Sequence, residues 1–156
     1  MDLETTGNSF TGSYSYTLDA KGRVNIPSKM RKALGPANDG TFVATRSGDP
    51  CIVLYPIKVW KEKLENKLLQ LNRGSAINRH FARNLVRHAE IMQYDSQGRV
   101  ALPANLITFA GIEKDVEIVG MIDRIELWAP ERLAEIEARF VDRDEEMETI
   151  AREIDL

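Results

Sequence analysis

The chain has 156 residues, with 21 Lys or Arg against 24 Asp or Glu, so its formal net charge is −3. An apolar content of 43% and a charged content of 29% indicate a folded domain and exclude wholesale disorder. The single cysteine, Cys51, excludes an intramolecular disulfide and a zinc site built from four cysteines.

The first segment, residues 1–12, is expected to be a flexible extension. It shows no basic region followed by an apolar run, which is the pattern of a secretion signal. No apolar stretch in the chain reaches the roughly 18 residues that a membrane-spanning helix needs. We therefore expect a cytoplasmic protein without a membrane partner.

An internal repeat organises the rest of the chain. The skeleton Asp-x-x-Gly-Arg-Val-x-(Ile/Leu)-Pro begins at Asp19 and returns 76 residues later at Asp95. Each copy then runs on to a β-like segment that ends in an aromatic residue and a nearby proline. We place repeat 1 at residues 13–56 and repeat 2 at residues 90–130.

Within repeat 1 the pattern is rich in strands. Residues 13–18 carry the aromatic and β-branched side chains of a strand, and residues 19–22 form a turn in which Asp bonds forward and Gly accepts a positive φ. Residues 23–26 alternate, with Val24 and Ile26 expected inward. Pro27 ends this strand and begins a short helix, residues 28–34, which Gly35 closes.

Two further strands are predicted in repeat 1, at residues 41–45 and 51–55. Repeat 2 follows the same plan, with Val100 and Leu102 inward and strands at residues 116–119 and 125–128. One such module is too small to bury a good core alone. The sequence therefore predicts an α+β, β-rich fold, in which two tandem repeats form a pseudo-two-fold β-barrel.

A helical hairpin is predicted between the repeats, at residues 57–89. Apolar residues recur every three or four positions in two segments that Gly74 separates, and Ser75 is the expected N-cap of the second helix. That helix carries a basic stripe of Arg79, Arg83 and Arg87, with His80 and His88 beside it. The stripe is either a solvated face or a contact for phosphate or an acidic neighbouring subunit.

The C-terminal segment, residues 131–156, is predicted to be an acidic helix that continues or frays toward its end. Charge is divided unevenly along the chain: residues 14–110 hold 15 basic and 7 acidic residues, whereas residues 111–156 hold 6 basic and 15 acidic. A basic body is thus masked by an acidic C-terminal third, and the net charge says little about a local nucleic-acid surface.

Signatures of catalysis are missing from the sequence. There is no Gly-x-Ser-x-Gly elbow and no Gly-x-x-x-x-Gly-Lys phosphate loop, and Cys51 lies within a predicted strand. The two histidines have no ligand partners at metal-binding spacing. We expect neither an enzyme nor a metal, cofactor or small-molecule site.

The repeated turn is the best candidate for a functional site. Asp19 and Asp95 are expected to cap their turns or to pair with Arg23 and Arg99, which is a purely structural role. Alternatively, an Arg held by Asp is a preorganised fork for guanine or phosphate. The structural residues of the motif are Asp19, Gly22, Asp95 and Gly98, and the predicted DNA contacts are Lys21, Arg23, Lys29, Arg31, Lys32 and Arg99. Repeat 1 is the more basic copy, so we expect Arg23 to matter more than Arg99.

The doubled motif and its spacing resemble the MraZ family of bacterial transcriptional regulators, within the AbrB-like superfamily of swapped-hairpin barrels. The resemblance covers roughly residues 10–140 and says little about the acidic tail. It implies a nucleoid-associated homo-oligomeric ring that binds double-stranded DNA at short direct repeats in the promoter of the division and cell wall gene cluster. Regulation of its own operon is part of that expectation.

Two other interpretations stay open. An antitoxin of the same fold group would repress its own operon and neutralise a partner, although antitoxins usually have one barrel module. A ring-forming scaffold would bind protein through the basic helix and the acidic tail.

Overall fold

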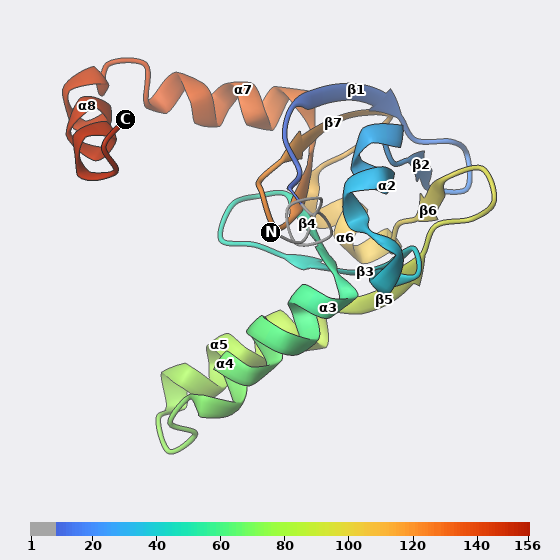
Figure 1. The fold of residues 1–156 in the computed structure, drawn as a ribbon, viewed down its shortest axis with the longest axis horizontal. Coiled ribbons are helices and arrows are strands. Elements are labelled where there is room, and N and C mark those ends of the chain that lie inside the picture. Colours follow the sequence, from blue (N-terminus) through green and yellow to red (C-terminus); the bar gives the residue numbers. More distant parts are fainter. Residues whose placement is uncertain (1–8) are drawn as a thin grey trace.

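The computed structural model of the chain describes residues 9–156 and shows a mixed α+β protein with two sheets (Figure 1). Residues 1–8, on which most of the predicted extension falls, lie outside the described residues. The strands are β1 (Ser13–Thr17), β2 (Arg23–Asn25), β3 (Thr41–Arg46), β4 (Ile52–Pro56), β5 (Glu90–Gln93), β6 (Arg99–Ala101), β7 (Asp115–Gly120) and β8 (Ile125–Trp128). The helices are α2 (Ser28–Leu34), η1 (Pro36–Asn38), α3 (Ile57–Val59), η2 (Trp60–Glu65), α4 (Asn66–Gln70), α5 (Ala76–Arg87), α6 (Ala104–Ala110), α7 (Pro130–Arg139) and α8 (Asp144–Glu153).

The larger sheet has six strands in the order β1-β7-β8-β4-β3-β5. The order reads as a palindrome of the two repeats, because β1, β3 and β4 of repeat 1 correspond to β5, β7 and β8 of repeat 2. The first strand of each repeat pairs with the other repeat: β1 with β7, and β5 with β3, all antiparallel. The repeats therefore exchange strands.

The remaining strands, β2 and β6, pair only with each other as a short antiparallel ribbon. Val24 lies opposite Val100 at its centre, and both side chains are buried. The backbone bonds around this centre come in equivalent pairs, Ile26 N–H to Gly98 O and Leu102 N–H to Gly22 O. The pseudo-two-fold axis passes through the middle of the ribbon.

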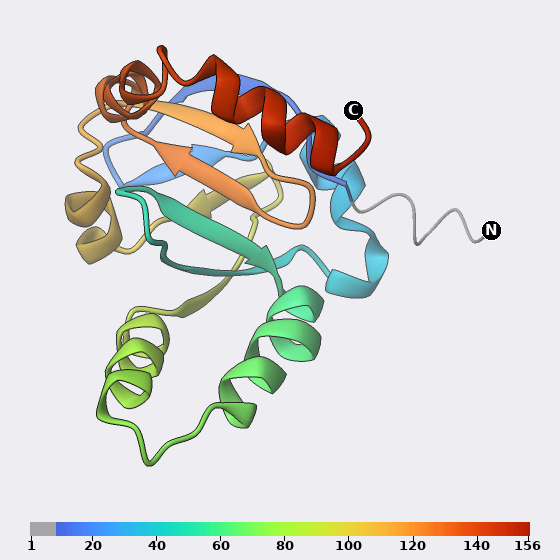
Figure 2. The ribbon, with the colours of Figure 1, turned by 90° about the vertical axis from the view of Figure 1, so that its left-hand side faces the viewer.

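The predicted α+β class and two-repeat organisation are confirmed, but the predicted barrel is not closed by hydrogen bonds. Among the described residues, β1 and β5 remain the two edges of the six-stranded sheet. The sheet cannot continue past them into the ribbon because the chain turns sharply at residues 19–22 and 95–98, which directs β2 and β6 toward each other. The ribbon instead covers the open side of a strongly curved sheet (Figure 2).

Apolar side chains cover both faces of the central strands. The inner cluster includes Leu54, Leu127 and the ribbon valines, whereas the outer cluster includes Val53, Trp60 and Trp128 under the helices. Burial on both faces explains why all five residues of β4 are buried and apolar. Phe10 joins the inner cluster through a β-bridge to Ile122.

The helical hairpin projects from one side of the sheet and consists of a first helix, residues 57–70, and α5. Ser75 caps α5 as predicted, since its hydroxyl accepts a bond from Asn78 N–H. The first helix differs from the expected regular helix: its middle, η2, is wound as a π-helix. This places Trp60 beside Glu65, and the indole Nε1–H donates to the carboxylate at 2.9 Å.

The acidic C-terminal segment forms two helices rather than one. The chain turns after α7, where Arg143 N–H bonds to Phe140 O, and α8 then takes a new direction (Figure 1). Val141 and Asp142, which have weak helix propensity, occupy this break. Within residues 9–156, no helix has the length and apolar character needed to cross a membrane.

Replacing Leu127 by Ala tests the inner cluster. Leu127 is fully buried on β8, so Leu127→Ala should lower the free energy of unfolding by about 2–5 kcal/mol. Chemical denaturation measures the loss. Val141→Ala, at a residue 69% exposed between α7 and α8, is the control and should change it by under about 0.5 kcal/mol. Equal losses in both variants would contradict the assigned core.

Candidate nucleic-acid interface

The turn of repeat 1 is organised around one carboxylate. Asp19 Oδ1 accepts bonds from the backbone N–H groups of Lys21 and Arg23, both at 2.9 Å. Asp19 Oδ2 accepts from Arg23 Nε at 2.7 Å, which also forms an ion pair. Asp19 therefore both caps the turn and pairs with Arg23, which fixes the turn and the direction of the arginine together.

The turn of repeat 2 repeats this arrangement. Asp95 Oδ1 accepts from Gln97 N–H at 2.9 Å and from Arg99 N–H at 3.0 Å, and Oδ2 accepts from Arg99 Nε at 3.0 Å. One contact breaks the symmetry: Arg99 Nη1 also lies 3.9 Å from Asp19 Oδ2. The two arginines therefore share one electrostatic network across the ribbon.

These hydrogen bonds stabilise the charged carboxylates. The bond from the Arg23 backbone N–H is the main cause that lowers the pKa of Asp19 below its usual 3.8, and the Arg23 side chain and Lys21 N–H lower it further. The Arg99 backbone N–H lowers the pKa of Asp95 in the same way. Both anchors are therefore negatively charged at neutral pH.

The ribbon directs both arginines to its outer face. Its register places Arg23 opposite Ala101 and Asn25 opposite Arg99. Because side chains alternate along a strand and both valines point inward, these four side chains share the face that points away from the core. A two-stranded ribbon of this kind fits into the DNA major groove, which is about 12 Å wide.

Glycine is required at the corresponding position of each turn. Gly22 and Gly98 have φ values of +75° and +78°, in the region that disfavours other residues. A Cβ atom at Gly98 would also displace the Arg31 guanidinium, which lies against this glycine.

The predicted basic residues of repeat 1 do not all lie beside its own turn. Lys21 is exposed in the turn, and Lys29 and Lys32 are exposed on α2. Arg31, however, reaches across to repeat 2, where Nη1 donates to Gln97 O at 3.4 Å. The equivalent contact on the other side is apolar: Ile107 lies against Gly22.

Asn25 is a further candidate on the ribbon that the predicted DNA contacts do not include. It is exposed on the same ribbon face as Arg23, two positions further along β2. The strand alternation that assigns Val24 to the core also places Asn25 beside the arginines, so the sequence held the necessary signal. An asparagine amide is the side chain best suited to pair with adenine.

Two further features of the described residues concern metal binding and nucleophilic chemistry. Across residues 9–156, no three His, Cys, Asp or Glu side chains come together as metal ligands. Burial raises the pKa of the Cys51 thiol to about 12, which disfavours the thiolate form that a nucleophile needs.

Comparison with known proteins gives concordant matches. A family model described as "MraZ protein, putative antitoxin-like" matches twice, at residues 9–84 and 85–155. The chain is 43% identical to the "Transcriptional regulator MraZ" of Natranaerobius thermophilus over 79% of this chain and 82% of that protein. It is 42% identical to proteins of the same name from Halothermothrix orenii, over 79% and 82%, and Symbiobacterium thermophilum, over 80% and 86%.

The lowered pKa of Asp19 predicts how the stability contributed by its carboxylate depends on pH. A carboxyl whose pKa is lowered on folding stabilises the folded state above its unfolded pKa, and this contribution disappears as the pH falls through the folded pKa. Asp19→Asn should therefore lower the melting temperature at pH 7, and the gap from the unmodified protein should close below pH 3.8.

Thermal unfolding followed by circular dichroism between pH 2.5 and 7 provides the measurement. Glu137→Gln on the exposed face of α7 controls for the loss of one negative charge. A gap for Asp19→Asn that is independent of pH would show that the charge of Asp19 does not stabilise the turn.

Proposed function

The chain belongs to the MraZ family of transcriptional regulators, and we propose that it binds promoter DNA sequence-specifically through the outer face of the β2–β6 ribbon. The observation that carries this proposal is the pair of Asp-anchored arginines on that face. Each arginine is held in direction before DNA arrives, which reduces the side-chain entropy lost on binding.

The side chains divide between reading bases and positioning the backbone. Arg23 and Arg99 are suited to guanine, and Asn25 is suited to adenine. Lys21 at the turn and Lys29 and Lys32 on α2 are suited to phosphates, which fix the register but carry no sequence information. Arg31 supports the turn of repeat 2 by donating a hydrogen bond to Gln97 O, and its positive charge adds to that of the proposed DNA-binding surface.

One ribbon offers too few contacts for firm binding alone. We therefore propose that several subunits assemble into a ring and that each ribbon binds one of a set of short direct repeats, because linked contacts act at high effective concentration. Following the family resemblance, the site is the promoter of the division and cell wall gene cluster, including the protein's own operon. The protein then works in the cytoplasm, on the nucleoid.

Two alternatives differ in what they bind. The antitoxin-like wording of the matched family model favours an autoregulator that also neutralises a partner protein. A scaffold would bind only protein. Salt dependence distinguishes DNA binding from the scaffold: the logarithm of the DNA affinity should fall linearly with the logarithm of salt concentration, with a slope that reports the phosphates contacted. The antitoxin-like autoregulator also binds DNA and differs in binding a partner protein as well.

Replacing Arg23 by Ala tests the ribbon. Loss of a two-pronged guanine contact should cost about 1–3 kcal/mol, or about a 5- to 150-fold loss of affinity, and Arg99→Ala should cost less. Mobility-shift titration on the protein's own upstream DNA measures both. Lys67→Ala removes one exposed charge from the helical hairpin and should leave affinity nearly unchanged. Undiminished binding by Arg23→Ala would reject the assignment.

Selection from random DNA tests the direct repeats. Fragments retained by the full chain should share a short motif that recurs in the same orientation at a constant spacing. The result expected from Asn25→Ala is a relaxed preference at one position of that motif. Recovery of a single inverted repeat would contradict the proposed mode of binding.

A further inference from the structure

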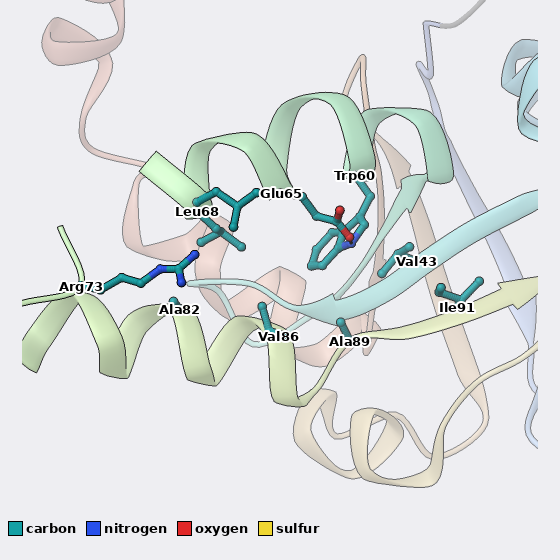
Figure 3. Close-up of a pocket in the computed structure, with 10 residues that line it drawn as sticks. Val43, Trp60, Glu65, Leu68, Arg73, Ala82, Val86, Ala89 and Ile91 are labelled. Atoms are coloured by element: carbon teal, nitrogen blue, oxygen red, sulfur yellow. The ribbon is translucent and has the colours of Figure 1, made fainter. Parts of the chain in front are cut away.

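The helical hairpin contains an apolar groove that the ribbon site does not use. It has a volume of about 440 Å³ and runs between the first helix of the hairpin and α5, with β3 and β5 at its base (Figure 3). Apolar side chains from both helices face one another across it. Its lining comprises Val43, Trp60, Glu65, Leu68, Leu69, Arg73, Ala82, Val86, Ala89 and Ile91.

The groove is open and only partly covered by its own chain. Leu69 is 64% exposed, Val86 is 51% exposed and Ile91 is 62% exposed. Ile91 also belongs to β5, an edge strand of the sheet. Apolar side chains gathered at an open groove are typical of a binding surface, whereas single exposed ones are ordinary.

The surroundings of the groove are strongly basic. Residues 57–89 contain eight Lys or Arg and two Asp or Glu. Arg73 lines the groove, and Arg79 and Arg83 line the adjoining hollow, where Arg79 Nη1 donates to Arg73 O at 2.7 Å. The one acidic lining residue, Glu65, already accepts bonds from Trp60 and Lys61. The groove therefore suits an apolar surface with negatively charged borders.

The C-terminal helix α8 has this complementary character. Met147 and Ile150 of α8 and Ile154 just after its end follow one another at spacings of three and four, and they are 52%, 57% and 67% exposed. Residues 131–156 contain ten Asp or Glu and four Lys or Arg, so their excess of six negative charges equals the hairpin's excess of six positive charges. A ten-residue helix is marginal in water without tertiary packing, so α8 needs a surface to pack against.

That surface is not supplied by the same subunit. The hairpin and α7 both pack on the outer cluster, but the hairpin extends from the sheet in one direction and α7 leads α8 away in another (Figures 1 and 2). None of the residues of α8 is buried. The groove and its complementary helix point away from each other within one chain, which is the arrangement expected of subunits that contact head to tail.

We propose that α8 of one subunit binds in the hairpin groove of a second copy. The apolar side of α8 fills the groove, and its carboxylates lie along the arginines at the border. Because the two surfaces differ, each bound copy leaves one free groove and one free α8, and repetition of the contact builds a ring when the rotation closes. The inference rests on the proposed ring and names the surfaces that form it.

Two double variants test the contact in the full-length chain. A groove variant carries Leu69→Asp and Val86→Asp, and a helix variant carries Met147→Asp and Ile150→Asp. All four side chains are at least half exposed, so the fold should survive, which circular dichroism checks. Mass is measured by light scattering and native mass spectrometry without DNA. Each variant should fall from the oligomer to the 17.6 kDa monomer.

Single-residue controls add one negative charge to the same helices outside the contact. Asn84→Asp lies on the side of α5 away from the groove, and Thr149→Asp lies off the apolar side of α8. Both should keep the mass of the unmodified protein. Loss of the oligomer in a control would overturn the assignment, because added charge alone would then explain the effect.

Mixing the two double variants gives the sharpest result. The groove variant keeps an intact α8 and the helix variant keeps an intact groove, so a one-to-one mixture should form a dimer of unlike chains and nothing larger. A mixture that stays monomeric would overturn the head-to-tail contact. So would double variants that keep the oligomeric mass.

Failure of this inference is distinguishable from failure of the proposed function. Arg23→Ala should leave the mass of the oligomer unchanged. The double variants should still bind DNA that carries a single short site, but their affinity should no longer rise when the DNA carries several sites. A groove variant that keeps its mass but loses affinity for DNA would assign the arginine border to phosphate and overturn the docking of α8. An unmodified protein that is monomeric would overturn both the ring and the contact.

Discussion

Strand exchange between the repeats is the constraint on which the rest of the structure depends. β1 has its partner in repeat 2, and β5 has its partner in repeat 1, so neither repeat holds a complete sheet. The inner cluster draws on both repeats and is buried only when both are folded. The β2–β6 ribbon, which closes over this cluster at the pseudo-two-fold axis, has its position fixed by the whole domain rather than by a local loop.

The local features of this fold could be predicted, because their causes lie within a few residues. Asp19 bonds to residues two and four positions ahead, and Ser75 caps the helix that follows it. The long-range features have no local signal. The exchange of strands between repeats follows only from the resemblance to the swapped-hairpin barrels, and it is observed in the pairing of β1 with β7 and of β5 with β3. No signal in the sequence shows that Arg31 crosses to the turn of the other repeat. The π-helix η2 is also without a local signal, and its first residue, Trp60, packs against sheet residues in the outer cluster.

The basic and acidic segments of the chain form separate surfaces in the folded protein. The basic hairpin and the acidic C-terminal helices extend in different directions from the outer face of the sheet, and the ribbon with its paired arginines lies apart from both (Figures 1 and 2). Three surfaces of different chemistry therefore share one small domain. Assembly through the hairpin and α8 would neutralise two of them and leave the ribbon as the main basic surface facing DNA, so a chain with net charge −3 can still attract phosphates locally.

The ribbon is symmetric in its backbone but not in its side chains. A two-fold rotation exchanges Arg23 with Arg99, but it brings Asn25 onto Ala101, which offers no amide to a base. The two orientations of the ribbon on DNA are therefore not equivalent. Rotation by 180° about the pseudo-two-fold axis would present a different pattern of hydrogen-bond donors and acceptors to the same base pairs. A head-to-tail ring holds every copy in the same sense around its circumference. A DNA segment that follows that circumference would meet every ribbon in the same orientation. The recognised motifs would therefore have to follow one another in the same direction on one strand.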